Sequence, residues 1–148
     1  MAIFGALTIM VFYVFLRIFF DKLSSFLAAL AFSLSLMHIH YSRTGFLSIS
    51  ASFFQVLSLL FIFYARKYKK ITYIIFGAIF TGLGMYSYTP FIIFPPTIIL
   101  LLIIDIFINK FSHFDIKKLL IFVVVFIAIS IPLLNVIILQ PNFYFSHS

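Results

Sequence analysis

Residues 91–109 read FIIFPPTIILLLIIDIFIN and carry one charged side chain, Asp105. A helix needs about 20 residues to cross the roughly 30 Å hydrocarbon core of a bilayer. This stretch is therefore predicted to be a transmembrane helix. A membrane β-strand is about half as long and alternates apolar with polar residues, and this stretch does not.

The rest of the chain has the same apolar character. Of its 148 residues, 65% are hydrophobic and 9% are charged, and the mean hydropathy is +1.27. A soluble domain usually has about 25% charged residues, so the composition disfavours a soluble enzyme, a nucleic-acid-binding domain and a disordered tail. The chain has no cysteine, and no cluster of His, Asp and Glu has metal-ligand spacing, so no cofactor or metal site is identified.

Six apolar segments are predicted to form one all-α transmembrane bundle. They lie at about residues 2–20, 23–38, 47–65, 71–89, 91–109 and 118–139. The short connectors favour a single domain over residues 1–148 with sequential helices antiparallel. Pro95 and Pro96, in the first turns of the fifth segment, are expected to kink it, and Pro132 is expected to bend the sixth. The small residues of the fourth segment are expected to let neighbouring helices approach closely.

Basic residues fall in alternate connectors. Nine of the ten Lys and Arg residues lie around residues 17–22, 66–70 and 110–118, and the other connectors hold only Arg43. Cytoplasmic loops of membrane proteins are enriched in Lys and Arg, so these three connectors are predicted to be cytoplasmic. We therefore expect an integral multi-pass protein, in the plasma membrane, with both ends of the chain on the external side.

The densest polar cluster predicted on the external side is HIHYSRT at residues 38–44. Arg43 is the only basic residue on that side, and its planar guanidinium offers several donors at once to a phosphate. With His40 and Tyr41 beside it, Arg43 is suited to hold the phosphate of a lipid-linked substrate. The other interpretation is an interfacial anchor, in which Arg43 reaches lipid phosphates and Tyr41 joins an aromatic belt.

A second external cluster, YSYTP at residues 86–90, follows the fourth segment. Tyr rings are common anchors at a membrane interface. Tyr86 and Tyr88 also suit sugar or phosphate contacts, because each has a ring face and a hydroxyl. Both interpretations stay open from the residues alone.

The three carboxylates, Asp21, Asp105 and Asp115, are predicted at or near the cytoplasmic ends of the segments. Asp105 lies about one turn inside its segment, where a carboxylate is a candidate functional group. It is also close enough to the interface to reach water or Lys110. The external side has no carboxylate, so no residue of this chain is assigned as a catalytic base there.

The run LMHIHYSRTGF at residues 36–46 resembles a stretch of GT-C type membrane glycosyltransferases. These enzymes are the relatives of protein O-mannosyltransferases and of the lipid A aminoarabinose transferase. In them a helix ends in a His-Tyr/Phe-Ser-Arg run on the external side. The stretch GLGMYSYTP at residues 82–90 is similar to another part of the family, where a Gly-rich helix ends in a Tyr-x-Tyr turn.

The resemblance implies an enzyme that takes a sugar from a polyprenyl-phosphate donor and transfers it to an acceptor on the external face. Its implied partners are the lipid-linked sugar and membrane lipids, and no nucleic acid. The implied donor-phosphate or substrate contacts are His40, Tyr41, Arg43, Tyr86 and Tyr88. In the family an aspartate of the first large external loop acts as the base or activates the acceptor. That loop would precede Met1, so we expect a fragment of a longer multi-pass protein, also lacking the C-terminal part and inactive alone.

Two other functions remain open from the sequence. A transporter or flippase fragment would favour polar groups near the midplane and inverted repeats, whereas this chain offers little there beyond Gln55 and shows no repeat. A non-catalytic membrane subunit would need only the bundle, and the absence of an external carboxylate favours it if the chain is a complete protein.

Overall fold

The computed structural model describes residues 2–36, 40, 48–108 and 115–139. These residues form α1 (Ala2–Leu16), α2 (Lys22–Ser33), α4 (Ser48–Tyr68), α5 (Ile71–Gly84), the 3₁₀-helix η1 (Thr89–Ile93), α6 (Phe94–Ile108) and α7 (Ile116–Leu139). No strand occurs within these ranges. The predicted all-α membrane-type bundle is therefore confirmed.

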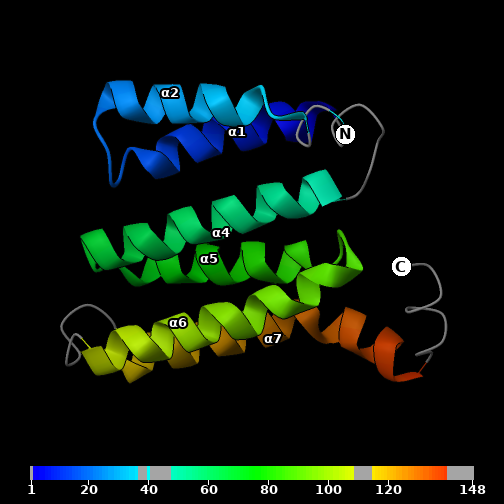
Figure 1. The fold of residues 1–148 in the computed structure, drawn as a ribbon. Helices are drawn as coiled ribbons and strands as arrows, with labels where there is room; N and C mark the ends of the chain where they lie inside the picture. The colour runs from blue at the N-terminus through cyan, green and yellow to red at the C-terminus, as the bar shows by residue number, and fades with distance from the viewer. Residues whose placement is uncertain (1, 37–39, 41–47, 109–114, 140–148) are drawn as a thin grey trace.

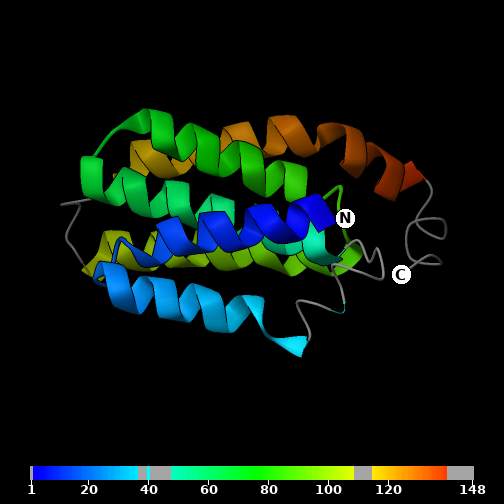
Figure 2. The same cartoon turned by 90° about the horizontal axis from the view of Figure 1, so that it is seen from above.

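The helices run back and forth between two ends of an elongated bundle (Figure 1). The helix α4 packs against both α1 and α5, and α5 packs in turn against α7. The outermost pair on one side is α1 with α2, and α6 lies beside α7. Figure 2, seen from above, shows the same near-parallel helix axes. Consecutive helices are antiparallel, as predicted from the short connectors.

Within the described ranges, three helical stretches have the length and composition to cross a membrane: Ser48–Tyr68, Thr89–Ile108 and Ile116–Leu133. The helices α1, α2 and α5 are apolar but have only 15, 12 and 14 residues. At 1.5 Å per residue, 12 residues extend only about 18 Å. The six predicted segments thus correspond to the six α-helices of the described residues, with η1 continuing into α6. The helices α1, α2 and α5 are shorter than the predicted spans.

The proline pair of the fifth segment starts a helix instead of kinking one. The backbone is 3₁₀-helical to Ile93 and becomes α-helical at Phe94, so Pro95 and Pro96 lie in the first turn of α6. A missing N–H costs little there, because the first-turn N–H groups of a helix have no intrahelical partner. Pro132 lies inside α7, and Figure 1 shows that helix changing direction in its C-terminal part, as predicted.

Two buried hydroxyls join α4 to α5. The Ser58 hydroxyl lies 2.6 Å from the Thr81 hydroxyl and 3.1 Å from the Gly77 carbonyl oxygen, to which Thr81 also donates at 2.8 Å. A Cβ added at Gly77 would lie 3.0 Å from Cγ1 of Ile62, which shows how closely the helices approach. Small residues and interhelical hydrogen bonds of this kind hold helices together in lipid.

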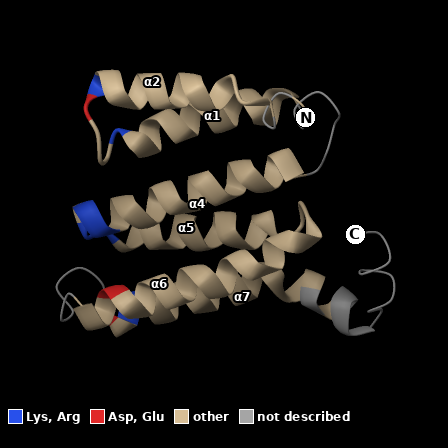
Figure 3. Cartoon of the chain, in the orientation of Figure 1, with Lys and Arg blue, Asp and Glu red and all other residues tan. Residues whose placement is uncertain are grey.

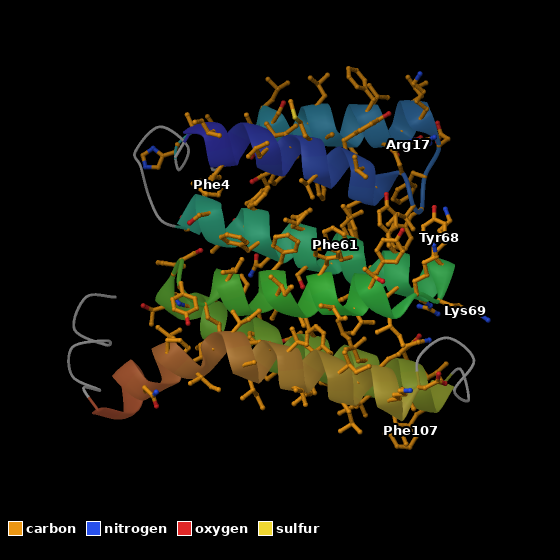
Figure 4. The ribbon with its side chains drawn as sticks, turned by 180° about the vertical axis from the view of Figure 1, so that it is seen from behind. Phe4, Arg17, Phe61, Tyr68, Lys69 and Phe107 are labelled. Atoms are coloured by element: carbon orange, nitrogen blue, oxygen red, sulfur yellow. The ribbon has the colours of Figure 1, made fainter. Side chains whose placement is uncertain are left out.

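The outer surface of the bundle is apolar. Phe107 is 79% exposed and Val124 is 64% exposed, and Figure 4 shows Phe107 pointing away from the neighbouring helices. Exposed large apolar side chains over so much of the surface are unusual for a monomer in water. They match the lipid-facing side of a membrane bundle.

Candidate functional site

The described charges gather at one end of the bundle (Figure 3). The described residues include eight of the ten Lys and Arg residues, all but Arg43 and Lys110, and all three carboxylates. They lie where α1, α4 and α6 end and where α2, α5 and α7 begin. We call this the charged end. The opposite end, where α4 begins and α5 ends, is called the uncharged end, since none of its described residues is Lys, Arg, Asp or Glu.

At the uncharged end, α5 is followed by a tight turn at residues 85–88 that carries Tyr86 and Tyr88. We call it the tyrosine turn. The N–H of Tyr86 donates to the Leu83 carbonyl at 3.1 Å, and the N–H of Ser87 donates to the Gly84 carbonyl at 3.0 Å. The chain then extends at Tyr88 before η1 begins. The ring of Phe91 occupies the space beside Gly84 in which a side chain would lie, so glycine permits this turn.

Tyr86 is attached to the neighbouring helix α7. Its hydroxyl donates to the Ile129 carbonyl oxygen at 2.7 Å, and Ile129 lies three residues before Pro132 in the same helix. Next to it, the Ser130 hydroxyl donates to the Met85 sulfur at 3.6 Å. A tyrosine hydroxyl has one hydrogen, so in this geometry Tyr86 offers a ligand its ring and oxygen lone pairs, not a donor.

Tyr88 lies beside the first turns of α4. Its half-buried side chain packs against the cluster formed by Ala51, Met85 and Phe91. The structure therefore brings the tyrosine turn next to the helix that follows residues 41–47. His40 is described and exposed. Two predicted site residues, Tyr41 and Arg43, lie outside the described residues.

We expect Tyr86→Phe to lower the free energy of unfolding by about 1 kcal/mol, because the Ile129 carbonyl loses its hydrogen-bond donor. Unfolding of the purified chain in mixed dodecyl maltoside and dodecyl sulfate, followed by circular dichroism, measures this change. Tyr13→Phe, which removes a hydroxyl from α1, is the matched control with no expected loss. Equal stability of Tyr86→Phe and the unchanged chain would contradict a structural role of this hydroxyl.

Asp105 forms an ion pair with Arg66, a partner that the sequence did not indicate. Its Oδ1 lies 3.3 Å from Nη2 of Arg66, and the two side chains are 14% and 43% exposed. The pair links α6 to the last turn of α4. The alternative partner considered above, Lys110, lies outside the described residues. In the sequence, Asp105 stands about one turn inside the predicted segment 91–109 and Arg66 directly follows the predicted segment 47–65, so nothing there paired the two residues.

The other two carboxylates also have local roles at the charged end. Asp21 caps α2 by accepting from the N–H groups of Leu23 at 3.0 Å and Ser24 at 3.2 Å. A hydrogen bond from the Ser24 hydroxyl, followed by the bond from the Ser24 N–H, holds the pKa of Asp21 below its ordinary value. Asp115 lies 3.9 Å from the ammonium of Lys118. All three carboxylates of the chain thus lie at the charged end, remote from the tyrosine turn.

Among the described residues, no group of His, Asp and Glu is arranged to hold a metal ion.

A family model for dolichyl-phosphate-mannose-protein mannosyltransferases matches residues 1–134 of this chain. The matched range contains residues 38–44 and 86–90 and every candidate site residue. No curated protein and no solved structure matches the chain.

Proposed function

Because the chain belongs to the dolichyl-phosphate-mannose-protein mannosyltransferase family, a family of membrane glycosyltransferases, we propose that its uncharged end binds a polyprenyl-phosphate-linked sugar. The sugar is then transferred to an acceptor on the external face. The family match over residues 1–134 carries this proposal. The tyrosine turn beside the start of α4 supports it.

The proposed orientation follows from the distribution of charge. The charged end holds eight of the ten Lys and Arg residues, and such residues favour the cytoplasmic side. The uncharged end then faces outward, in the plasma membrane. A polyprenyl phosphate keeps its isoprenoid chain in the hydrocarbon core and its phosphate at the level of the headgroups. The tyrosine turn lies at that end of the bundle.

Arg43 is the proposed partner of the donor phosphate. It stands in the sequence between His40 and Ser48, the first residue of α4. When the acceptor oxygen bonds to the anomeric carbon, the bond between that carbon and the phosphate oxygen breaks, and negative charge develops on the leaving phosphate. A guanidinium placed there stabilises this charge. His40, Tyr41 and Tyr88 are proposed to line the same site.

The chain is proposed to contribute donor binding and not the base. The acceptor hydroxyl must lose a proton, and the three carboxylates that could accept one all lie at the charged end. The proposed base is therefore a carboxylate outside these 148 residues. By this proposal the purified chain alone binds donor without transferring its sugar.

We expect Arg43→Gln to weaken the binding of polyprenyl-phosphate mannose at least about tenfold. Hydrogen bonds to a charged group are worth about 1.5–3 kcal/mol, and 1.4 kcal/mol is a factor of ten in affinity. Equilibrium binding of radiolabelled donor to the purified chain in detergent measures the effect. Lys117→Gln, which removes one cation from the charged end, is the matched control and should bind donor like the unchanged chain.

Two results would overturn the proposal. One is no saturable donor binding by the unchanged chain, which would favour the non-catalytic membrane subunit. The other is an equal loss of binding in Arg43→Gln and Lys117→Gln, because general electrostatic attraction would then explain it.

A further inference from the structure

Two hollows meet at the charged end of the bundle. One, of about 290 Å³, lies between α4 and α6. Its apolar wall includes Leu59, Ile62, Ile98, Leu101 and Leu102. The other, of about 370 Å³, lies between the turn after α1 and the end of α4. Both hollows are lined by Phe63 and Arg66.

Arg66 is held between the two hollows. Its ion pair with Asp105 spans the space between α4 and α6. These two helices are not among the closely packed helix pairs of the described residues. A guanidinium has five N–H donors in a planar fork, and the single contact at 3.3 Å occupies only part of it. The carboxylate therefore positions the fork and leaves donors for a second anion.

Two further cations line the second hollow. Lys67 lies in the last turn of α4, one residue before its end at Tyr68, and Lys69 follows the helix with a left-handed φ of 57°. The N–H of Lys69 donates to the Ala65 carbonyl at 2.9 Å, which closes the helix. Figure 4 shows Lys69 projecting from this end of the bundle. The hollows thus carry three cations, Arg66 included, against one carboxylate.

We propose that the hollows form a site for one anionic glycerophospholipid of the surrounding bilayer. Its phosphate contacts Arg66, Lys67 and Lys69, and an acyl chain enters the apolar hollow between α4 and α6. Basic pockets between membrane helices attract anionic headgroups, at about fivefold in affinity for each Lys or Arg. A zwitterionic lipid brings its own cation and compensates the excess charge less well.

This site is separate from the proposed donor site. The donor is bound at the uncharged end, whereas the hollows lie among the residues of the charged end. The lipid inference therefore does not depend on glycosyl transfer, and either proposal can fail alone. The proposed role of the bound lipid is structural. By filling the gap between α4 and α6, the lipid supplies packing that the two helices do not supply to each other.

Native mass spectrometry of the purified chain tests the proposal, with equal amounts of phosphatidylglycerol and phosphatidylcholine that share the same acyl chains. We expect phosphatidylglycerol adducts to exceed phosphatidylcholine adducts at least about fivefold. The double variant Lys67→Gln and Lys69→Asn should reduce this ratio below about twofold. It keeps the bond between Arg66 and Asp105, and asparagine tolerates a left-handed φ better than most residues.

The matched control is Lys22→Gln combined with Lys117→Gln. It removes the same charge from the same end but from residues that do not line either hollow. Its lipid ratio should equal that of the unchanged chain. An equal fall of the ratio in both double variants would overturn the proposal, because it would indicate a diffuse surface potential.

A second variant tests the acyl part of the site and keeps every cation. Leu101 is 51% exposed and lines the hollow, so Leu101→Trp should fill the space without disturbing the core. We expect phosphatidylglycerol adducts to fall at least about threefold. The proposal fails if they do not fall, if the two lipids bind equally, or if glycerol 3-phosphate displaces phosphatidylglycerol at equal concentration. The last result would indicate a phosphate site without a lipid chain.

Discussion

Gly84→Ala is expected to lower the free energy of unfolding by about 3 kcal/mol, near the upper part of the range for overpacked interiors. A Cβ at Gly84 would lie 2.6 Å from two carbons of the Phe91 ring. Phe91 is only 2% exposed and packs at a ring-centroid distance of 5.0 Å against Phe94, so it cannot swing aside. Unfolding in mixed detergents, followed by circular dichroism, measures the loss.

Gly77→Ala is the matched control in the same helix. There the added Cβ would meet one carbon of the Ile62 side chain at 3.0 Å, which a small rotation can relieve, so we expect a change below about 1 kcal/mol. Phe91→Leu in the Gly84→Ala background should recover part of the stability, because it removes the clashing ring atoms. Similar losses at Gly84 and Gly77 would refute the packing of Phe91 on Gly84.

Phe122→Ala is expected to cost about 2 kcal/mol. Phe122 is fully buried in the core cluster with Ile74, Ala78, Ile98 and Leu102. In a soluble protein such a change costs about 3–5 kcal/mol, from lost transfer energy and from the cavity. In lipid the unfolded reference state is also surrounded by apolar groups, so the transfer contribution shrinks and the lost packing remains.

The control for this loss is Leu120→Ala in the same helix. Leu120 is 59% exposed, and its side chain exchanges one apolar environment for another when the bundle unfolds in a micelle. The expected change is therefore close to zero. A loss at Leu120 as large as at Phe122 would mean that this face of α7 is buried in an assembly.

Apolar length and charge alternation predict much of this fold. The all-α class, the antiparallel order and the gathering of charge at one end follow from segments separated by basic connectors. Helix lengths do not follow, because they depend on local capping. The predicted span 2–20 ends early, at Leu16. The N–H of Phe19 donates to the Leu16 carbonyl at 3.0 Å in a tighter turn, and the Arg17 guanidinium donates to the Phe20 carbonyl at 3.1 Å.

The candidate site could be predicted only in part. Sequence clusters indicate which polar residues stand together in a loop, and Tyr86 and Tyr88 do lie in one turn. The contacts of Tyr86 with Ile129 and of Arg66 with Asp105 join helices that are distant in the sequence. They depend on how α5 packs on α7 and how α4 faces α6. The hydrophobic periodicity of one segment does not specify how its helix is rotated about its axis relative to its neighbours.

The one-sided placement of ionised groups makes the molecule respond to voltage. Moving one elementary charge across a membrane potential of 100 mV involves about 2.3 kcal/mol. An excess of cations at one pole, eight against three carboxylates among the described residues, therefore couples the insertion direction to the electric field. A membrane potential that is negative on the side of these cations stabilises this orientation of the helices. Depolarisation of the membrane removes that contribution.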